Sequence, residues 1–311
     1  MINFLKKYLS FFFFHIYEKN IILNGLIASN QNKKKKEIKN LTEVEFSVFS
    51  QWGEDGIIDW LINQCEDIPK RFIEFGVGDY LESNTRFLIK KRNWQGLILE
   101  SNYKDVIKIK LDPIYWRHDL ILKNTLITKE NINEIIKKNL RNLDIGLLSV
   151  DLDGNDFWIL KHINCINPCI IVCEYNAIFG DLKMLTVPYH PTFNRTSSHY
   201  SNLYFGASIK ALVGLLKHKG YSFLGSNSNG VNAFFVRNDY ARKILKQIKS
   251  IDYFSSSLRE SRNIKRKKNF IRGLNRIDII KDKKVYDLSK KKLIFLSEIK
   301  NIYSKSWKIN C

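Results

Sequence analysis

The five cysteines of this sequence lack the paired CxxC spacing that zinc sites and redox motifs use. They are Cys65, Cys165, Cys169, Cys173 and Cys311. This spacing excludes the usual zinc sites and gives no support to a disulfide framework. It fits a reducing, cytoplasmic setting.

The sequence also lacks the run of about 20 apolar residues that a membrane-spanning helix needs. Its most apolar segment, LSFFFF at positions 9–14, follows Lys6 and Lys7 and is interrupted by His15 and Glu18. No typical cleavage site follows, so we expect neither a spanning helix nor a signal peptide. Two alternatives remain for this segment: a helix lying on a membrane surface, or a helix packed on the domain.

Acidic residues are scarce at both ends of the chain, whose formal net charge is +20. Residues 255–311 hold 17 Lys and Arg against 5 Asp and Glu, and residues 1–46 hold 8 against 4. We therefore predict a basic N-terminal extension at 1–46, an α/β domain at 47–254 and a Lys/Arg-rich extension at 255–311. The basic ends could contact an anionic membrane surface or nucleic acid, or they could reflect an AT-rich genome.

The segment FIEFGVGDYLESN at positions 72–84 has two of the three glycines of a dinucleotide-binding motif. Gly76 and Gly78 follow a strand pattern, and Asp79 would place negative charge beside a pyrophosphate. This favours S-adenosylmethionine, which is cationic and has no phosphate, over NAD or FAD. Glu100 ends the next strand pattern, 22 residues after Gly78, close to the roughly 20 at which a carboxylate binds ribose hydroxyls. Without a ligand, the same pattern would be an ordinary tight turn.

Strand and helix patterns alternate through the middle of the chain. Strands are expected at 72–75, 96–100, 120–127, 146–150 and 170–173, followed by a hairpin of 221–225 and 231–237. This order predicts an α/β fold: a doubly wound, mostly parallel, Rossmann-like sheet with a terminal antiparallel hairpin and a ligand crevice at its strand ends. The irregular segment 181–204 would lie near that crevice, and its histidines and tyrosines could contact substrate or anchor the loop. These are Tyr189, His190, His199, Tyr200 and Tyr204.

Carboxylates gather after the fourth and fifth strand patterns. Asp151, Asp153 and Glu174 are candidates for a base that accepts the proton of an acceptor hydroxyl, whereas Asp156 also fits a helix cap. Such carboxylates could hold Mg²⁺, but we predict a site without metal.

The blocks SQWGEDGI, FIEFGVGD, ESNTRFL, NWQGLILE and LLSVDLDGND resemble, in this order, the FkbM-like methyltransferases of the class I S-adenosylmethionine-dependent fold, over about residues 50–237. The resemblance implies that Glu74, Gly76 and Gly78 line the methionine and ribose side of the cofactor and that Glu100 binds the ribose hydroxyls. It also implies that Thr128 and Glu130 contact the adenine and that Asp151 lies beside the sulfonium. Gln51 and Glu54 would fold over the cofactor.

The predicted function is therefore methyl transfer from S-adenosylmethionine to a hydroxyl of a glycan or small molecule. Two alternatives stay open. The basic ends could make the protein a nucleic-acid methyltransferase or nucleic-acid-binding protein, and the fold could serve as a non-catalytic scaffold.

Overall fold

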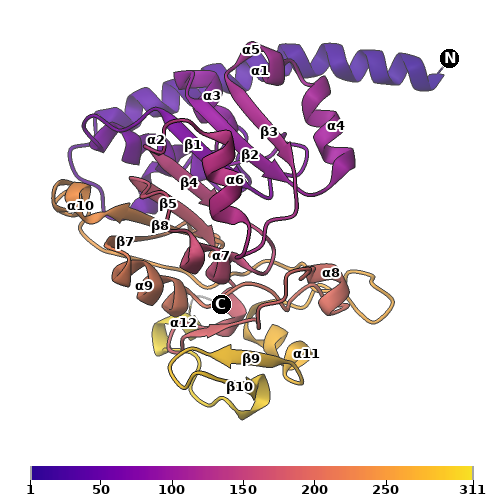
Figure 1. The fold of residues 1–311 in the computed structure, drawn as a ribbon, viewed down its shortest axis with the longest axis vertical. Helices are drawn as coiled ribbons and strands as arrows, with labels where there is room; N and C mark the ends of the chain where they lie inside the picture. The colour runs from indigo at the N-terminus through magenta and orange to yellow at the C-terminus, as the bar shows by residue number, and fades with distance from the viewer. Residues whose placement is uncertain (1, 310–311) are drawn as a thin grey trace.

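A seven-stranded sheet forms the centre of the computed structural model, which describes residues 2–309 and the side chains of 17–308 (Figure 1). Its strand order is β3-β2-β1-β4-β5-β8-β7. The strands are β1 (Arg71–Phe75), β2 (Gln95–Glu100), β3 (Leu120–Asn124), β4 (Leu147–Val150), β5 (Ile170–Glu174), β7 (Tyr221–Ser226) and β8 (Asn232–Arg237). β1 to β5 are parallel, and β8 runs antiparallel to both of its neighbours. The predicted fold class, including its terminal antiparallel hairpin, is confirmed.

Helices cover both faces of the sheet because the strands carry apolar side chains on both of their faces. Phe72 of β1 lies in the core beneath one group of helices, and its neighbour Ile73 lies in the core beneath the other. The first group is α2 (Glu54–Gln64), α3 (Arg86–Arg92), α4 (Tyr103–Leu111), α5 (Pro113–Arg117) and α10 (Asn238–Leu245). The second is α6 (Ile132–Asn139), α7 (Asp156–His162) and α9 (Ile209–His218). The strand order reverses between β1 and β4, and a parallel sheet leaves a crevice at that point.

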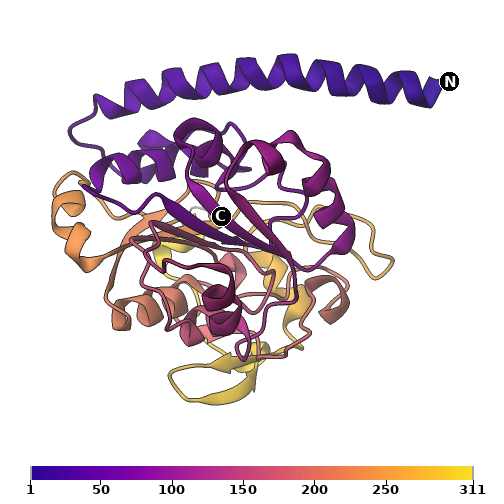
Figure 2. The same cartoon turned by 45° about the horizontal axis from the view of Figure 1, so that its top comes forward.

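The N-terminal helix α1 (Ile2–Lys33) packs along the first group of helices in the part whose side chains are described (Figure 2). Asn32 donates to the Val44 carbonyl at 2.8 Å, and Glu18 forms ion pairs with Arg86 at 3.3 Å and Lys90 at 2.8 Å. Residues 17–33 of this helix are therefore packed on the domain, and both alternatives for the segment at positions 9–14 stay untested. The aromatic side chains at positions 11–14 lie outside the described side chains. No described helix is both long and apolar enough to cross a bilayer.

The basic C-terminal segment folds against the domain over its described residues, 255–309. β9 (Lys284–Asp287) pairs with β10 (Lys292–Phe295) and with β6 (Leu185–Thr186), which belongs to the irregular segment. A small apolar core lies beneath this second sheet. The short helical turns here are η2 (Ala177–Phe179), α8 (Arg195–Ser198), η3 (Gly273–Arg276), α11 (Ile277–Ile280), η4 (Leu296–Glu298) and α12 (Lys305–Ile309); η1 (Leu41–Val44) follows α1.

Trp307 of α12 shows how firmly the C-terminal segment is attached. Its ring is only 2% exposed and lies 5.9 Å from Tyr253 and 6.5 Å from Tyr175, measured between ring centroids. We expect Trp307→Ala to lower the free energy of unfolding by about 3–5 kcal/mol because it leaves a large cavity. Trp116→Ala, at a ring that is 69% exposed, is the matched control and should change it by less than about 0.5 kcal/mol. Urea denaturation measures both, and equal midpoints would show that α12 contributes no stability.

Candidate cofactor and acceptor cleft

Three connected cavities follow the carboxyl ends of β1 to β5 and meet at Gly76 and Asp151. The β2 lobe, of about 360 Å³, lies beside the ends of β2 and β3. The β1 lobe, of about 280 Å³, lies between the glycine turn and residues 51–54. The β5 lobe, of about 270 Å³, lies between the ends of β4 and β5 and the C-terminal segment. The cleft therefore occupies the crevice that the sheet order creates.

The glycine turn after β1 forms the wall shared by the three lobes. Gly76 has φ +70°, and a Cβ atom added there would lie 1.7 Å from the Asp151 carbonyl oxygen. Gly78 has φ +55°, and a Cβ added there would meet no atom within 4 Å. Gly76 therefore lets the ends of β1 and β4 approach each other, whereas Gly78 leaves open space in the cleft.

Alanine substitutions should separate these two roles. We expect Gly76→Ala to prevent folding, since its Cβ would overlap the β4 backbone. Gly78→Ala should fold with a loss of about 1 kcal/mol, the cost of the left-handed backbone, and should bind S-adenosylmethionine at least about tenfold more weakly because its methyl group enters the cleft. Circular dichroism and calorimetry are the measurements. Wild-type affinity in a folded Gly78→Ala variant would show that no ligand approaches this turn.

Glu100, at the end of β2, lines the β2 lobe and is bonded directly to the glycine turn. Its Oε2 accepts a hydrogen bond from the Gly78 N–H at 2.8 Å, and its Oε1 accepts one from the Asn102 N–H at 2.7 Å. Each carboxylate oxygen has a second lone pair available to a ligand. The structure thus brings together the two features, Gly78 and Glu100, that the sequence proposed as one site.

Glu74 and Glu54 line the β1 lobe, but their carboxylates hold the protein backbone and neighbouring side chains. Glu74 accepts bonds from the Asn84 N–H at 2.8 Å, from the Thr85 N–H at 3.2 Å and from the Thr85 hydroxyl. Burial raises the pKa of Glu74 to about 7. Glu54 accepts bonds from the Trp52 N–H and from the side-chain amides of Asn227 and Asn232, each at 2.8 Å. Both acids therefore fix the loops that shape this lobe.

The structure places Thr128 and Glu130 away from the cleft. β3 ends at Asn124, three residues before the end that the sequence predicted, so residues 125–127 line the β2 lobe instead. Thr128 donates its N–H to Asn131 Oδ1 at 2.8 Å, and Glu130 accepts the Tyr189 hydroxyl at 2.5 Å. These residues organise the turn before α6, and Thr125–Ile127 line the β2 lobe in their place.

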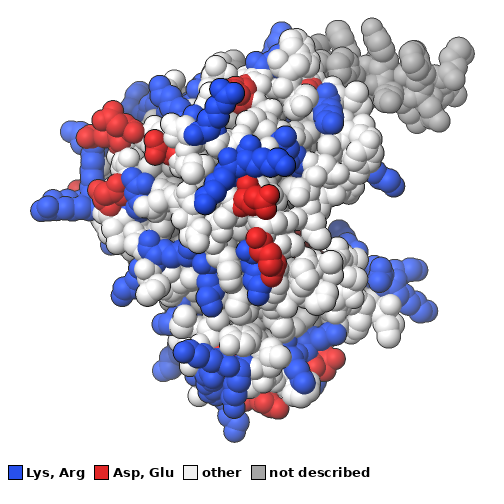
Figure 3. Space-filling view, viewed as in Figure 1, with Lys and Arg blue, Asp and Glu red and all other residues white. Residues whose placement is uncertain are grey.

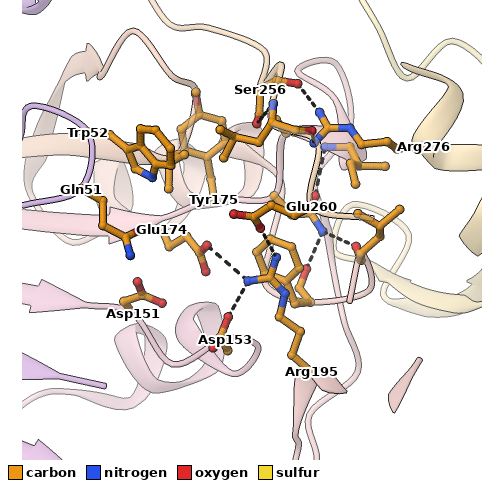
Figure 4. A pocket seen from close by; sticks show the side chains of 18 of the residues that line it. Gln51, Trp52, Asp151, Asp153, Glu174, Tyr175, Arg195, Ser256, Glu260 and Arg276 are labelled. Carbon is orange, nitrogen blue, oxygen red and sulfur yellow. Dashed lines mark hydrogen bonds and ion pairs between the residues drawn. The ribbon is translucent and has the colours of Figure 1, made fainter. Parts of the chain in front are cut away.

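A cluster of carboxylates lies where the β5 lobe meets the other two (Figure 4). Asp151, Asp153 and Glu174 each have a carboxylate oxygen within 4.8 Å of the others. Arg195 Nη1 lies 2.6 Å from Asp153 Oδ1 and 3.8 Å from Glu174 Oε1, and its Nη2 lies 3.5 Å from Glu260 Oε2. The spacing of the three acids would allow them to share a cation, and Arg195 already supplies positive charge there.

Burial and mutual repulsion alter the chemistry of two of these acids. Burial, followed by the charge of Asp153, raises the pKa of Asp151 well above its usual range, and Arg195 opposes the shift. Burial and the charge of Asp151 raise the pKa of Glu174 in the same direction. Among the described residues, Glu174 Oε2 has no hydrogen-bond partner although it is buried. Asp151 and Glu174 therefore form a carboxyl pair that can hold and exchange a proton.

Other candidate residues have structural partners. Both Asp156 oxygens accept backbone N–H groups, from Leu152 at 2.7 Å and Gly154 at 3.0 Å, so Asp156 shapes the turn before α7. Neither His190 nor His199 lines the three lobes. Tyr204 donates its hydroxyl to the Lys284 carbonyl at 2.5 Å, so it anchors the loop to the second sheet.

Arg195 and the C-terminal residues of the β5 lobe are the functional candidates that sequence reasoning missed. Arg195 lies in the irregular segment, where no periodicity marks it, and its guanidinium stacks on Phe205 at 3.6 Å from the ring centroid. The C-terminal segment contributes Ser256, Leu258, Glu260 and Arg276. The only signal available was that long loops near strand ends often carry function.

No protein-family model and no curated protein matches the chain. Three solved structures illustrate the likenesses that exist. The N-terminal domain of EvdMO1 with SAH bound has 13% sequence identity and a TM-score of 0.35, and the match covers 53% of this chain and 72% of that one. An O-methyltransferase family protein from Burkholderia thailandensis has 11% identity and a TM-score of 0.34, and the match covers 60% of this chain and 59% of that one. Human N-acetylserotonin methyltransferase in complex with SAM has 13% identity and a TM-score of 0.34, and the match covers 60% of this chain and 55% of that one.

The chain spans less than two thirds of the length of the last two. At these TM-scores the likenesses carry no argument about activity. The fold is defined instead by the strand order and directions of this chain.

Proposed function

We propose that this protein is an S-adenosylmethionine-dependent methyltransferase, related to the FkbM-like enzymes, that methylates a hydroxyl of a polar acceptor such as a glycan. One observation carries the proposal. The Gly78 turn and the Glu100 carboxylate, joined by a hydrogen bond of 2.8 Å, line one cavity that opens, at Gly76 and Asp151, onto the carboxyl pair of half-buried Asp151 and buried Glu174.

The residues of the β2 lobe fit an adenosyl group. Gly78 leaves room for a ligand beside the backbone, Glu100 has free lone pairs for ribose hydroxyls, and residues 125–127 would border the base. The acids at the junction of the lobes would favour a cationic sulfonium over a phosphate. When bound, S-adenosylmethionine would supply an electrophilic methyl group.

The carboxyl pair would serve as the base. An acceptor hydroxyl in the β5 lobe could donate its proton to Asp151 or Glu174, whose raised pKa values favour proton uptake. Asp153 lies nearby, but it is exposed and its carboxylate is bound to Arg195. We therefore assign Asp153 and Arg195 to orienting the acceptor and the pair.

The lining of the β5 lobe suits an acceptor rich in hydroxyl groups. Charged and amide side chains dominate it: Gln51, Asp151, Asp153, Glu174, Asn176, Arg195, Glu260 and Arg276. Carboxylates and guanidinium groups bind hydroxyls by charge-assisted hydrogen bonds. The four free cysteines among the described residues support our proposal of a reducing, cytoplasmic location.

Titration calorimetry with S-adenosylmethionine and S-adenosylhomocysteine tests the proposal. We expect both to bind, and no binding of either at millimolar concentration would refute it. Methyl transfer to a panel of sugars and sugar nucleotides tests the catalytic step. Cofactor binding without turnover on any acceptor would favour a non-catalytic scaffold.

A nucleic-acid substrate is less favoured by the charge of the cleft. Phosphates entering the β5 lobe would meet Asp151, Asp153, Glu174 and Glu260. A nucleic-acid enzyme should bind RNA or DNA with steep salt dependence. We expect weak binding with a shallow salt response.

A further inference from the structure

Helix α4 exposes apolar side chains on the side that faces away from the core. Tyr103, Ile107 and Leu111 are spaced four residues apart, so they share one side of the helix. We call them the α4 stripe; Leu111 is 78% exposed and Tyr103 is 64% exposed. Val106 and Ile109, on the other side, are buried in the core. A contiguous apolar stripe on the exposed side of a helix marks a candidate contact surface.

Positive charge borders the α4 stripe. Lys104 and Lys110 of α4 and Arg117 of α5 are exposed, and no acidic side chain among the described residues forms an ion pair with them. Trp116, on α5, adds a further exposed aromatic ring. An apolar surface that ends in aromatic rings and basic side chains is typical of a helix at a membrane interface.

A second basic element, the basic hairpin of residues 261–269, projects from the C-terminal segment. Arg262 and Lys268 form an antiparallel bridge, and Asn263 organises the turn by accepting the N–H groups of Lys265 at 3.0 Å and Lys267 at 3.1 Å. At its apex, Ile264 is 80% exposed. The hairpin carries five cations without an ion-pair partner among the described side chains: Arg262, Lys265, Arg266, Lys267 and Lys268.

The α4 stripe and the basic hairpin flank the cleft. Asp105 of α4 lines the β2 lobe, and Glu260, immediately before the basic hairpin, lines the β5 lobe. Both elements lie at the same edge of the molecule, on the right in Figures 1 and 2. The surface is hollowed at this edge, and Lys and Arg side chains project above and below the hollow (Figure 3).

We propose that this edge docks on a bilayer containing anionic lipids, with the α4 stripe and Ile264 in the interface and the flanking cations on the headgroups. The charge distribution favours this occupant over a second copy of the chain, because self-association would bring like charges together. Ile107, Leu111 and Ile264 gain free energy from hydrocarbon, whereas the phosphate backbone of a nucleic acid offers them no apolar partner. The mouth of the cleft then faces the headgroups.

Vesicle sedimentation of the full chain without cofactor tests the docking independently of the proposed methyltransferase activity. We expect binding to vesicles in which about one third of the phosphatidylcholine is replaced by phosphatidylglycerol. Binding to phosphatidylcholine alone should be weak, and added salt should reduce binding to the anionic vesicles.

Two sets of variants locate the surface. Lys265→Gln, Lys267→Gln and Lys268→Gln together should weaken binding about 100-fold, since each cation near an anionic surface contributes about fivefold. Ile107→Asn with Leu111→Asn should weaken it at least about tenfold. The matched controls lie at strand β10 and the turn before it. Lys290→Gln with Lys291→Gln and Lys292→Gln removes the same charge, and Leu293→Asn removes an exposed apolar side chain. The controls should bind as the wild type does.

Several results would overturn the proposal. The folded wild type could fail to bind vesicles, or the control variants could lose as much vesicle binding as the variants of the proposed surface. Binding to single-stranded RNA that survives where vesicle binding fails would make the surface a nucleic-acid site. A dimer in size-exclusion chromatography that Leu111→Asn converts to a monomer would make it a self-association surface. Circular dichroism shows whether each variant is folded.

Discussion

Replacing Glu100 by alanine is expected to weaken the binding of S-adenosylmethionine and S-adenosylhomocysteine by about 100-fold while the domain stays folded. The substitution removes the carboxylate proposed to bind the ribose hydroxyls, and each charge-assisted hydrogen bond contributes about 1.5–3 kcal/mol. It also releases the N–H groups of Gly78 and Asn102 that Glu100 holds in place. Titration calorimetry measures both affinities.

Asp119→Ala is the matched control for this experiment. Asp119 is an exposed carboxylate just before β3, at the amino ends of the strands and so at the opposite end of the sheet from Glu100, where it accepts a hydrogen bond from Gln95 at 2.6 Å. Its loss removes the same charge and should leave cofactor affinity unchanged. Equal affinities of the wild type and Glu100→Ala would show that Glu100 does not bind the cofactor. They would also contradict the assignment of the β2 lobe to the adenosyl group.

Glu174→Gln is expected to lower kcat by about 10²–10⁴-fold, the usual contribution of a general base. Glutamine keeps the size of the side chain but cannot take up the proton, so cofactor affinity should change by less than about threefold. Single-turnover methyl transfer and calorimetry separate the two effects. Asp153→Asn, at the exposed carboxylate paired with Arg195, should lower kcat by no more than about tenfold.

The pH profile distinguishes a base from a structural residue. The raised pKa values of Asp151 and Glu174 predict a wild-type rate that rises with pH above the usual carboxyl range, because the pair must lose a proton to accept one. In Glu174→Gln the residual activity would depend on Asp151 alone, whose pKa burial and the charge of Asp153 still raise, so its profile should follow one group instead of a coupled pair. A profile that keeps its midpoint, with unchanged kcat, would contradict this assignment.

The pattern of the sequence was sufficient to predict the main sheet. Apolar strand runs that end in polar residues identified β1, β2, β4 and β5, and the SNSNG turn identified the β7–β8 hairpin. The boundary of β3 was wrong by three residues because Leu126 and Ile127 are apolar although they lie beyond the strand. Apolar residues in a loop and apolar residues in a strand give the same local sequence pattern, so composition alone could not separate them.

What the sequence by itself determined is the fold and the line of strand ends on which Gly76, Gly78, Glu100, Asp151 and Glu174 lie, because alternation, glycine turns and chain order are local properties. Tertiary structure alone decided that Arg195 joins the carboxylates, that residues between 256 and 276 complete the β5 lobe, and that helix α4 and the basic hairpin share an edge. These contacts join segments far apart in the chain. Their partners are selected by packing and charge in the folded state, and no spacing in the sequence records them.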